Sequence, residues 1–278
     1  MSLRLFRFRR FSVRLLALLL GLLCAVLVTT FLLIRRANEA SALANAEARL
    51  EVGAGIFDET VRQRIDYLAG SARVMSGDYA FKQVLDRDAA TLSSALESYT
   101  RRVQAPLIAL LDPDGQLRAN SDAAMENENA GPFRQLIGLA RDKDPAEASG
   151  FAYLKNQLYV LVVVPLYAPF PEIAAWFGLA FPLDRVFAQK IKDATRIEAT
   201  FVSTDDAAHP RVLATTLPDH LAAAVARAAV DNRRDHPRLR TLDLAGDRYL
   251  TLFKMQDLLG DAPITVVLQR PLAAELAA

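Results

Sequence analysis

The feature that most constrains this chain of 278 residues is an uncharged apolar run from Leu15 to Ile34. As a helix rising about 1.5 Å per residue, this run is roughly as long as the 30 Å hydrocarbon core of a bilayer. Five arginines precede it within residues 1–14, whereas only Arg35 and Arg36 follow it directly. Because arginine-rich flanks stay on the cytoplasmic side of a membrane, we expect everything after Arg36 to lie on the other side.

Three other interpretations of this run agree less well with the sequence. A cleaved signal peptide has a shorter apolar region that ends in a small-residue cleavage site, but here the run meets Arg35 and Arg36 directly. A lipoprotein signal would place its cysteine at the end of the run, whereas Cys24 lies in the middle. The length and the basic flank argue against a helix buried in a protein core. The sequence therefore favours a retained transmembrane anchor.

Composition excludes several classes of protein and site. The 33 Lys and Arg residues nearly balance the 32 Asp and Glu residues, so the chain has no basic stripe and we expect no nucleic-acid partner. Cys24 is the single cysteine, so neither a disulfide nor a thiolate metal site can form outside the span. We expect an ordinary hydrophobic core to stabilise the external region.

A long stalk helix is predicted to continue from the span. No proline occurs between Met1 and Tyr99, and the first break is expected at Gly77, with Gly53 and Gly55 as weak points. Apolar residues recur there at spacings of three and four, which is typical of one helix face. This stripe could be a dimer seam or the face that covers the downstream domain, and its members are Leu43, Leu50, Ala54, Phe57, Val61, Ile65, Leu68, Ala72 and Met75.

Beyond the stalk, the predicted elements occur twice in the same order. Short helices are expected at 79–85 and 89–104, then two strands, a helix at 131–141 and three strands. A helix at 184–194, two strands, a helix at 218–230 and three strands follow. The strands are predicted near 107–111, 116–120, 151–154, 158–166, 173–181, 197–203, 212–215, 239–244, 248–255 and 264–269. The pattern indicates two copies of one module of roughly ninety residues.

This arrangement resembles the double Cache extracytoplasmic sensor domains of bacterial receptors, which have a membrane helix, a long stalk and two PAS-like modules. Four segments carry the resemblance: Val61–Ile65, the hairpin Ile108–Leu117, Gly150–Tyr153 and Phe181–Arg185. It implies an α+β fold in which a transmembrane helix continues into the stalk and two tandem modules contain antiparallel sheets.

The resemblance also implies a division of the chain into functional segments. These are a cytoplasmic basic N-terminus (1–14), a transmembrane helix (15–34), stalk and lead-in helices (35–105), a membrane-distal module (106–182), a membrane-proximal module (183–272) and the start of an exit helix (273–278). The last segment looks like a helix cut short before a second span, so we expect the chain to be part of a longer protein.

Signals for catalysis or for a metal site are weak. His209, His220 and His236 lie far apart without the spacing of metal ligands. Asp112, Asp114 and Gly115 are similar to the start of a calcium loop, but the later acidic ligand is missing, and a tight turn is the better interpretation. We therefore expect no catalytic residues, no metal and no cofactor, and we do not expect this chain to be an enzyme.

A small-molecule pocket is expected instead, in the distal module. The resemblance implies a ligand between the distal sheet and the segment that links its second and third strands, Ser121 to Ser149. Aromatic walls with a few polar groups suit a small ligand, although core packing is the alternative for each aromatic residue. The candidate ligand-binding residues are Ser121, Asp122, Phe133, Arg134, Tyr153, Tyr159 and Trp176.

The leading hypothesis is a ligand-sensing module of a transmembrane receptor that relays binding to a cytoplasmic output domain absent from this chain. Its expected partners are an unknown small molecule and a second copy of the chain, paired through stalk and transmembrane helices. The expected location is the bacterial inner membrane, with the sensor in the periplasm. The alternative is a protein-interaction, dimerisation or envelope-stress module without a small ligand.

Overall fold

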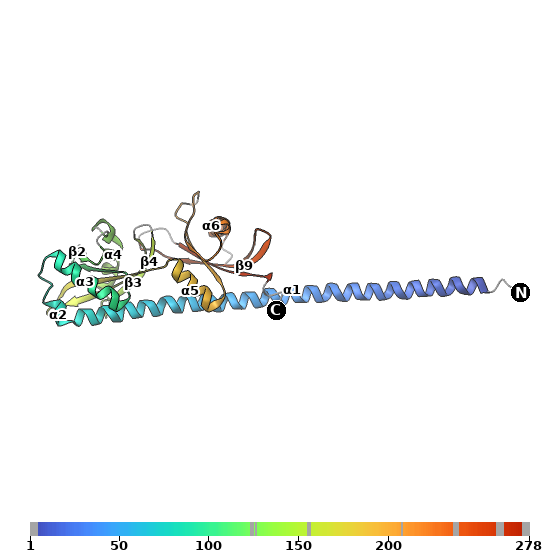
Figure 1. Cartoon of the computed structure of the whole chain (residues 1–278), viewed down its shortest axis with the longest axis horizontal. Coiled ribbons are helices and arrows are strands. Elements are labelled where there is room, and N and C mark those ends of the chain that lie inside the picture. Colours follow the sequence, from blue (N-terminus) through green and yellow to red (C-terminus); the bar gives the residue numbers. More distant parts are fainter. Residues whose placement is uncertain are drawn as a thin grey trace.

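A single long helix organises the whole molecule. The computed structural model describes residues 5–122, 125, 127–154, 157–206, 208–235, 239–259 and 264–273. Helix α1 (Leu5–Gly77) is continuous over 73 residues, about 110 Å at 1.5 Å per residue. Figure 1 shows the two modules side by side along its C-terminal part, while its N-terminal part projects alone. The predicted unbroken helix and its end at Gly77 are confirmed.

Two short helices follow α1 at the far end of the molecule. The Asp78 side chain caps α2 (Tyr79–Lys82) by accepting a hydrogen bond from the Ala80 amide, and Asp88 caps α3 (Ala89–Val103) in the same way through Thr91. Gln104 adopts a left-handed conformation with φ of 48°, which ends α3 and turns the chain into the first sheet.

The first sheet has five antiparallel strands in the order β2-β1-β5-β4-β3. Because α1 carries the chain away from its N-terminus before this sheet begins, the first module is the one farther from the apolar span (Figure 1). We call it the distal module. Its elements are β1 (Leu107–Leu111), β2 (Leu117–Asn120), η1 (Asn127–Ala130), α4 (Gly131–Ala140), β3 (Ala148–Leu154), β4 (Gln157–Tyr167) and β5 (Ile173–Pro182).

The second sheet repeats the first in strand order, β7-β6-β10-β9-β8. The identical order confirms that the module is duplicated. We call this copy the proximal module, and its elements are α5 (Arg185–Thr195), β6 (Glu198–Ser203), β7 (Arg211–Thr215), α6 (Asp219–Asp235), β8 (Leu239–Leu244), β9 (Asp247–Gln256) and β10 (Ile264–Pro271).

Each sheet is covered on both faces. In the distal module, α1, α2 and α3 cover one face, while η1 and α4 cover the other. In the proximal module, α1 and α5 cover one face and α6 covers the other. Alternate residues of a strand point to opposite faces, so every central strand contributes to two cores.

Helix α1 packs against both modules through one continuous stripe. Leu50 and Phe57 are buried in the proximal core, and Leu68 and Met75 are buried in the distal core. The predicted apolar stripe is therefore the face that covers the modules, with Leu43 still 41% exposed at its beginning. The proximal core also takes in Leu158 and Val160 from distal strand β4, so the two modules share buried contacts.

Among the described residues, α1 is the one helix that is both long and apolar enough to cross a membrane. Its side chains from Leu18 to Ile34 lie exposed, and the protein itself supplies no apolar partner for them. The predicted exit helix lies almost wholly outside the described residues, which end at Ala273.

Candidate functional site

The face of the distal sheet beneath α4 holds most of the predicted ligand-binding residues. Phe133 of α4 and Trp176 of β5 are fully buried in one apolar cluster, and Tyr159 of β4 packs against its border. The described part of the segment between β2 and β3, which contains η1 and α4, covers this face. We call the cluster of Phe133, Tyr159 and Trp176 the distal aromatic cluster.

Trp176 carries the clearest chemical signal in this cluster. Its indole Nε1–H is buried and finds no acceptor among the described residues. A buried donor without a partner costs about 1–3 kcal/mol, because its hydrogen bond to water is lost and not replaced. A ligand that supplied an acceptor at this point would remove that cost.

Phe133 fits against the sheet because Gly178 has no side chain. A Cβ on Gly178 would lie 2.6 Å from Phe133 Cδ1 and 3.2 Å from Leu111 Cδ1. Real Cβ atoms essentially never come within 3.0 Å of a neighbour, so it is the absence of a side chain at Gly178 that allows the Phe133 ring to pack against the strand.

Tyr159 stands at the polar edge of the same face. Its hydroxyl lies 3.1 Å from Gln157 Oε1 and donates a hydrogen bond to it. Burial raises the pKa of the Tyr159 hydroxyl, and the nearby carboxylates of Asp122 and Asp184 raise it further. Asp122 therefore lies within electrostatic range of the Tyr159 hydroxyl.

Ser121 has a structural task beside this cluster. Its Oγ accepts a hydrogen bond from the Ile108 amide at 2.9 Å, and its own amide donates to the Ile108 carbonyl at 2.9 Å. These two bonds close the end of the β1–β2 pair, and the first of them uses an acceptor site of the hydroxyl that was predicted to face a ligand.

Arg134 and Tyr153 lie away from the cluster. Arg134 packs over the β1–β2 turn, where a Cβ on Gly115 would lie 2.7 Å from Arg134 Cγ. Tyr153 points to the opposite face of β3 and packs against the core shared with the proximal module, where the Arg211 guanidinium lies 5.8 Å from its ring centroid. The structure thus brings three of the seven predicted residues together, Phe133, Tyr159 and Trp176, with Asp122 within electrostatic range of the Tyr159 hydroxyl.

The turn that was compared with a calcium loop has a structural explanation. Asp112 Oδ1 accepts hydrogen bonds from the amides of Asp114 and Gln116, and Gly115 adopts φ of 81°. Within the described residues, no three His, Cys, Asp or Glu side chains converge as metal ligands. His209 lies on the surface beside Asp206, His220 lies in the first turn of α6, and His236 lies outside the described residues.

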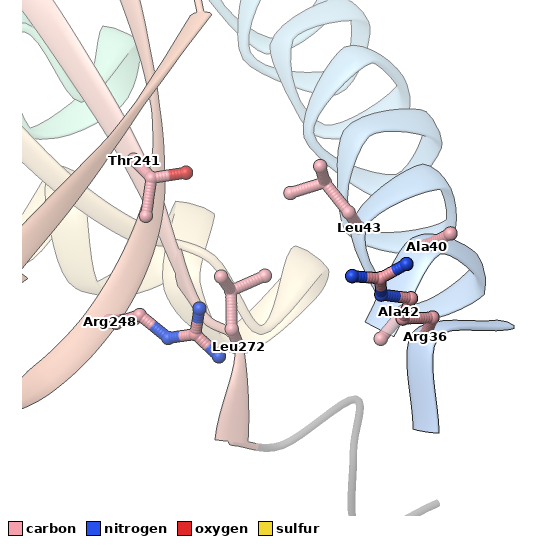
Figure 2. Close-up of a pocket in the computed structure, with 7 residues that line it drawn as sticks. All are labelled: Arg36, Ala40, Ala42, Leu43, Thr241, Arg248 and Leu272. Atoms are coloured by element: carbon pink, nitrogen blue, oxygen red, sulfur yellow. The ribbon is translucent and has the colours of Figure 1, made fainter. Parts of the chain in front are cut away.

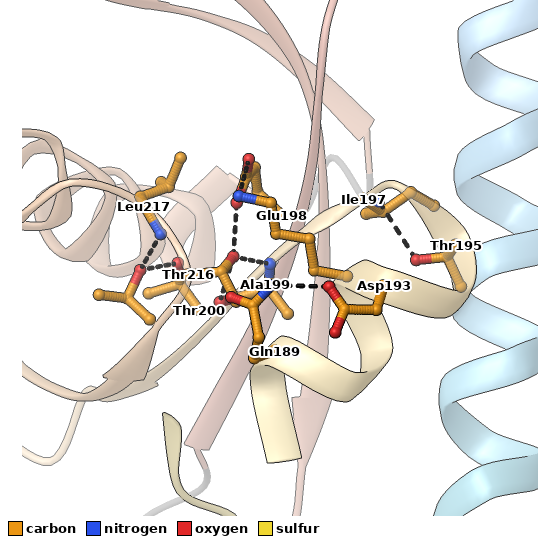
Figure 3. Close-up of polar contacts among 11 residues, drawn as sticks. Gln189, Asp193, Thr195, Ile197, Glu198, Ala199, Thr200, Thr216 and Leu217 are labelled. Carbon is orange, nitrogen blue, oxygen red and sulfur yellow. Dashed lines mark hydrogen bonds and ion pairs between the residues drawn. The ribbon is translucent and has the colours of Figure 1, made fainter. Parts of the chain in front are cut away.

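The proximal module contains a polar network that links α5, β6 and β7 (Figure 3). Thr216 Oγ1 donates to Glu198 Oε2 at 2.6 Å and accepts from the Ala199 amide at 2.9 Å, while the hydroxyls of Thr200 and Thr215 lie 2.8 Å apart. Lys192 of α5 joins the network through an ion pair of 2.8 Å with Glu198. Because the Lys192–Glu198 ion pair joins β6 to α5, a displacement of β6 would move α5 as well. Helix α5 in turn packs on α1.

The last strand of the proximal module ends beside α1. Figure 2 shows Leu272 and Arg248 on one side of a cavity, and Leu43 and Arg36 of α1 on the other. The cavity measures about 320 Å³. The point where the chain leaves the proximal module therefore lies close to the end of the apolar span.

Comparison with known proteins decides the family. The model of the family described as the double sensory domain of two-component sensor kinase (dCache_3) matches residues 43–276, which include both modules and most of the stalk. The chain belongs to this double Cache family. No curated protein gives a significant sequence match.

Solved double Cache structures have the same fold. The sensor domain of the V. cholerae histidine kinase DctB is 14% identical, with a TM-score of 0.52, over 82% of this chain and 98% of that one. The sensory domain of the Campylobacter jejuni chemoreceptor Tlp3 with isoleucine bound is 13% identical, with a TM-score of 0.55, over 87% and 97%. The extracellular domain of the putative histidine kinase vpHK1S-Z8 is 11% identical, with a TM-score of 0.52, over 86% and 98%.

Proposed function

We propose that this chain is the extracytoplasmic ligand-sensing region of a transmembrane signal-transduction receptor. The observation that carries the proposal is the buried Trp176 indole, whose N–H lacks an acceptor on the face beneath α4 in a family of sensory domains. Tlp3, whose sensory domain has this fold, has been crystallised with isoleucine bound. The ligand of this chain is a small molecule that offers a hydrogen-bond acceptor to Trp176.

Binding acts on the proximal module through contacts already present in the fold. A ligand shifts an equilibrium only by its different affinity for two states, here two positions of α4 over the distal aromatic cluster. Distal strand β3 contacts the proximal module, since the Leu259 amide donates to the Phe151 carbonyl at 2.9 Å. The displacement then reaches Leu272 and α1 across the cavity of Figure 2, on the scale of about 1–2 Å known for helix shifts at interfaces.

The proposed topology follows from the apolar span. Residues 15–34 cross the bacterial inner membrane, the arginine-rich N-terminus is cytoplasmic and both modules are periplasmic. An output domain outside this chain reads the displacement, and the sensory region itself performs no catalysis.

A homodimer through α1 completes the proposal. The face that covers the modules is occupied, but a second apolar stripe, about 120° around the helix at 100° per residue, is exposed. Val52 and Val74 of this stripe are 64% and 76% exposed, and Ile56 and Tyr67 lie between them on the same face. A second copy of α1 would bury this stripe.

A ligand screen tests the proposal. The full chain in lipid nanodiscs would be screened by thermal shift against amino acids, carboxylates and polyamines. We expect at least one compound to raise the unfolding temperature in a saturable way, because a ligand that binds only the folded state stabilises that state.

One observation favours a second function, an interaction module without a small ligand. Phe133 and Trp176 are 0% exposed, so their side chains already fill the face beneath α4. This second function would be supported if no compound in the screen bound and the full chain in nanodiscs instead bound a partner protein.

A further inference from the structure

A second cleft lies beside α1 near the junction of the two modules, away from the distal aromatic cluster. It has a volume of about 460 Å³, within the range of about 300–1,000 Å³ that is usual for small-molecule sites. Its walls come from four segments: α1 with Arg64 and Tyr67, the end of α3 with Gln104, the end of β5 with Phe181, and α5 with Phe187 and Lys190.

Arg64 is held in this cleft with one donor unused. Its guanidinium lies 4.1 Å from the ring centroid of Phe181 and 5.2 Å from that of Tyr67, and Nη2 donates to the Gln104 carbonyl. Its Nε–H is buried and has no acceptor among the residues that the structure describes. The guanidinium is thus oriented by two aromatic rings while part of its donor set remains open.

The cleft holds two positive charges and lacks a negative one. Lys190 lines the same cleft, and no described carboxylate forms an ion pair with Arg64 or Lys190. Burial lowers the pKa of the Arg64 guanidinium, and the Tyr67 phenol, which opposes this effect, offsets only part of it. Removing a cation from water without an anionic partner is unfavourable, and the two rings offset only part of that cost.

We propose that this cleft is a second binding site, for a small carboxylate anion held between Arg64 and Lys190. A planar guanidinium stacked on an aromatic ring presents its N–H groups in the geometry that matches a carboxylate. The bound anion would connect α1 with α5 and would therefore brace the stalk against the proximal module. This site is independent of the ligand proposed for the distal aromatic cluster.

The experiment uses the full chain in nanodiscs of zwitterionic lipid, which adds no competing anionic headgroups. Acetate, succinate and citrate are titrated calorimetrically up to about 10 mM, a range that detects millimolar dissociation constants. Acetamide and succinamide are the uncharged counterparts, and sodium chloride keeps the ionic strength constant. The variants are Arg64→Gln, Lys190→Gln and, as control, Arg185→Gln, an exposed cation on the same helix as Lys190 and outside the cleft.

At least one of the three carboxylates is expected to bind, while its amide does not. Because a charged hydrogen bond contributes about 1.5–3 kcal/mol, Lys190→Gln and Arg64→Gln should each weaken binding roughly ten- to hundredfold, and Arg185→Gln should leave it unchanged. Lys190 is exposed, so its variant tests the site even if Arg64→Gln impairs folding.

Three results would overturn the proposal. One is that none of the three carboxylates binds to the wild-type chain. Another is equal binding by the Lys190→Gln variant. The third is loss of carboxylate binding in Trp176→Phe but not in Lys190→Gln, which would place the anion at the distal aromatic cluster.

Discussion

Gly53 of α1 lies so close to Ile197, the residue before β6, that a Cβ on Gly53 would be 2.0 Å from Ile197 Cδ1. Both residues are buried, so the stalk touches the proximal module where that module begins its sheet. Gly55, two residues further along the same helix, has no atom within 4 Å of the corresponding position.

This difference predicts opposite effects of two similar substitutions. Gly55→Ala should stabilise the full chain by about 0.5–1 kcal/mol, because alanine favours a helix over glycine. Gly53→Ala gains the same helix propensity, but its methyl group overpacks the contact with Ile197, which costs about 1–3 kcal/mol of stability. This substitution should therefore be neutral or destabilising. Thermal unfolding in detergent, followed by circular dichroism, ranks the two variants. An equal gain for both would mean that α1 is not packed tightly on the proximal module.

A second pair of glycines tests the distal aromatic cluster. Gly178→Ala should cost about 1–3 kcal/mol, because its methyl group would meet the Phe133 ring. Gly138→Ala on α4, whose new methyl group would meet nothing within 4 Å, is the matched control and should be neutral or stabilising. Adding Phe133→Leu to Gly178→Ala should recover part of the loss in a double-mutant cycle. Additive effects would contradict the contact.

The hydrogen bond from the Tyr99 hydroxyl to Asp78 predicts a change of stability in alkaline solution. Burial and this bond raise the pKa of Tyr99 from 10.0 to about 12. The folded state therefore binds the phenolic proton more tightly, and the resulting stability is complete below pH 10 and is lost as pH rises toward 12. The Tyr99→Phe variant should lack this loss. Measuring the free energy of unfolding of both proteins between pH 10 and pH 12 checks the prediction. An absorbance titration of the wild-type chain in which no tyrosine ionises near pH 12 would contradict the raised pKa of Tyr99.

The exposed stripe on α1 predicts the oligomeric state. Val52→Glu and Val74→Glu should convert a dimer to a monomer, because each places a charge in the proposed helix contact. Val186→Glu on α5 is the matched control, since Val186 is 63% exposed and Val52 is 64% exposed. Analytical ultracentrifugation in detergent measures the mass of each variant. A dimer that survives both α1 substitutions would mean that this stripe is not the interface.

Much of the fold could be predicted from the sequence because its signals are local. The proline-free register up to Gly77 gave the long helix, and alternation of apolar residues gave the strands to within about three residues of their ends. The duplication followed from the repeated order of elements, and the two sheets confirm it. The function of the stripe on α1 could not be decided locally, because it depends on which surfaces fold back onto the helix.

The candidate site was harder to predict, because it depends on which face of a strand each side chain occupies and on contacts between residues far apart in the sequence. β3 begins at Ala148, and Ala152 and Leu154 face α4, so Tyr153 between them must face the other way. Ser121 was predicted from its position, but its hydroxyl is used by Ile108 of the neighbouring strand. Arg64 was missed altogether, because its partners Gln104 and Phe181 lie far along the chain and the sequence around Arg64 reads as an ordinary polar flank of the stripe.

The most direct test of ligand sensing is the affinity of the best compound from the screen for the wild-type chain and for Trp176→Phe. The substitution keeps an aromatic ring but removes the unpartnered N–H, so stability without ligand should change little or improve. Calorimetric titration in nanodiscs should show binding to the wild type and an affinity roughly tenfold lower for the variant, the effect of about 1.4 kcal/mol in one hydrogen bond. Equal affinity for the two proteins, or no compound that binds the wild type, would contradict a ligand site at the distal aromatic cluster.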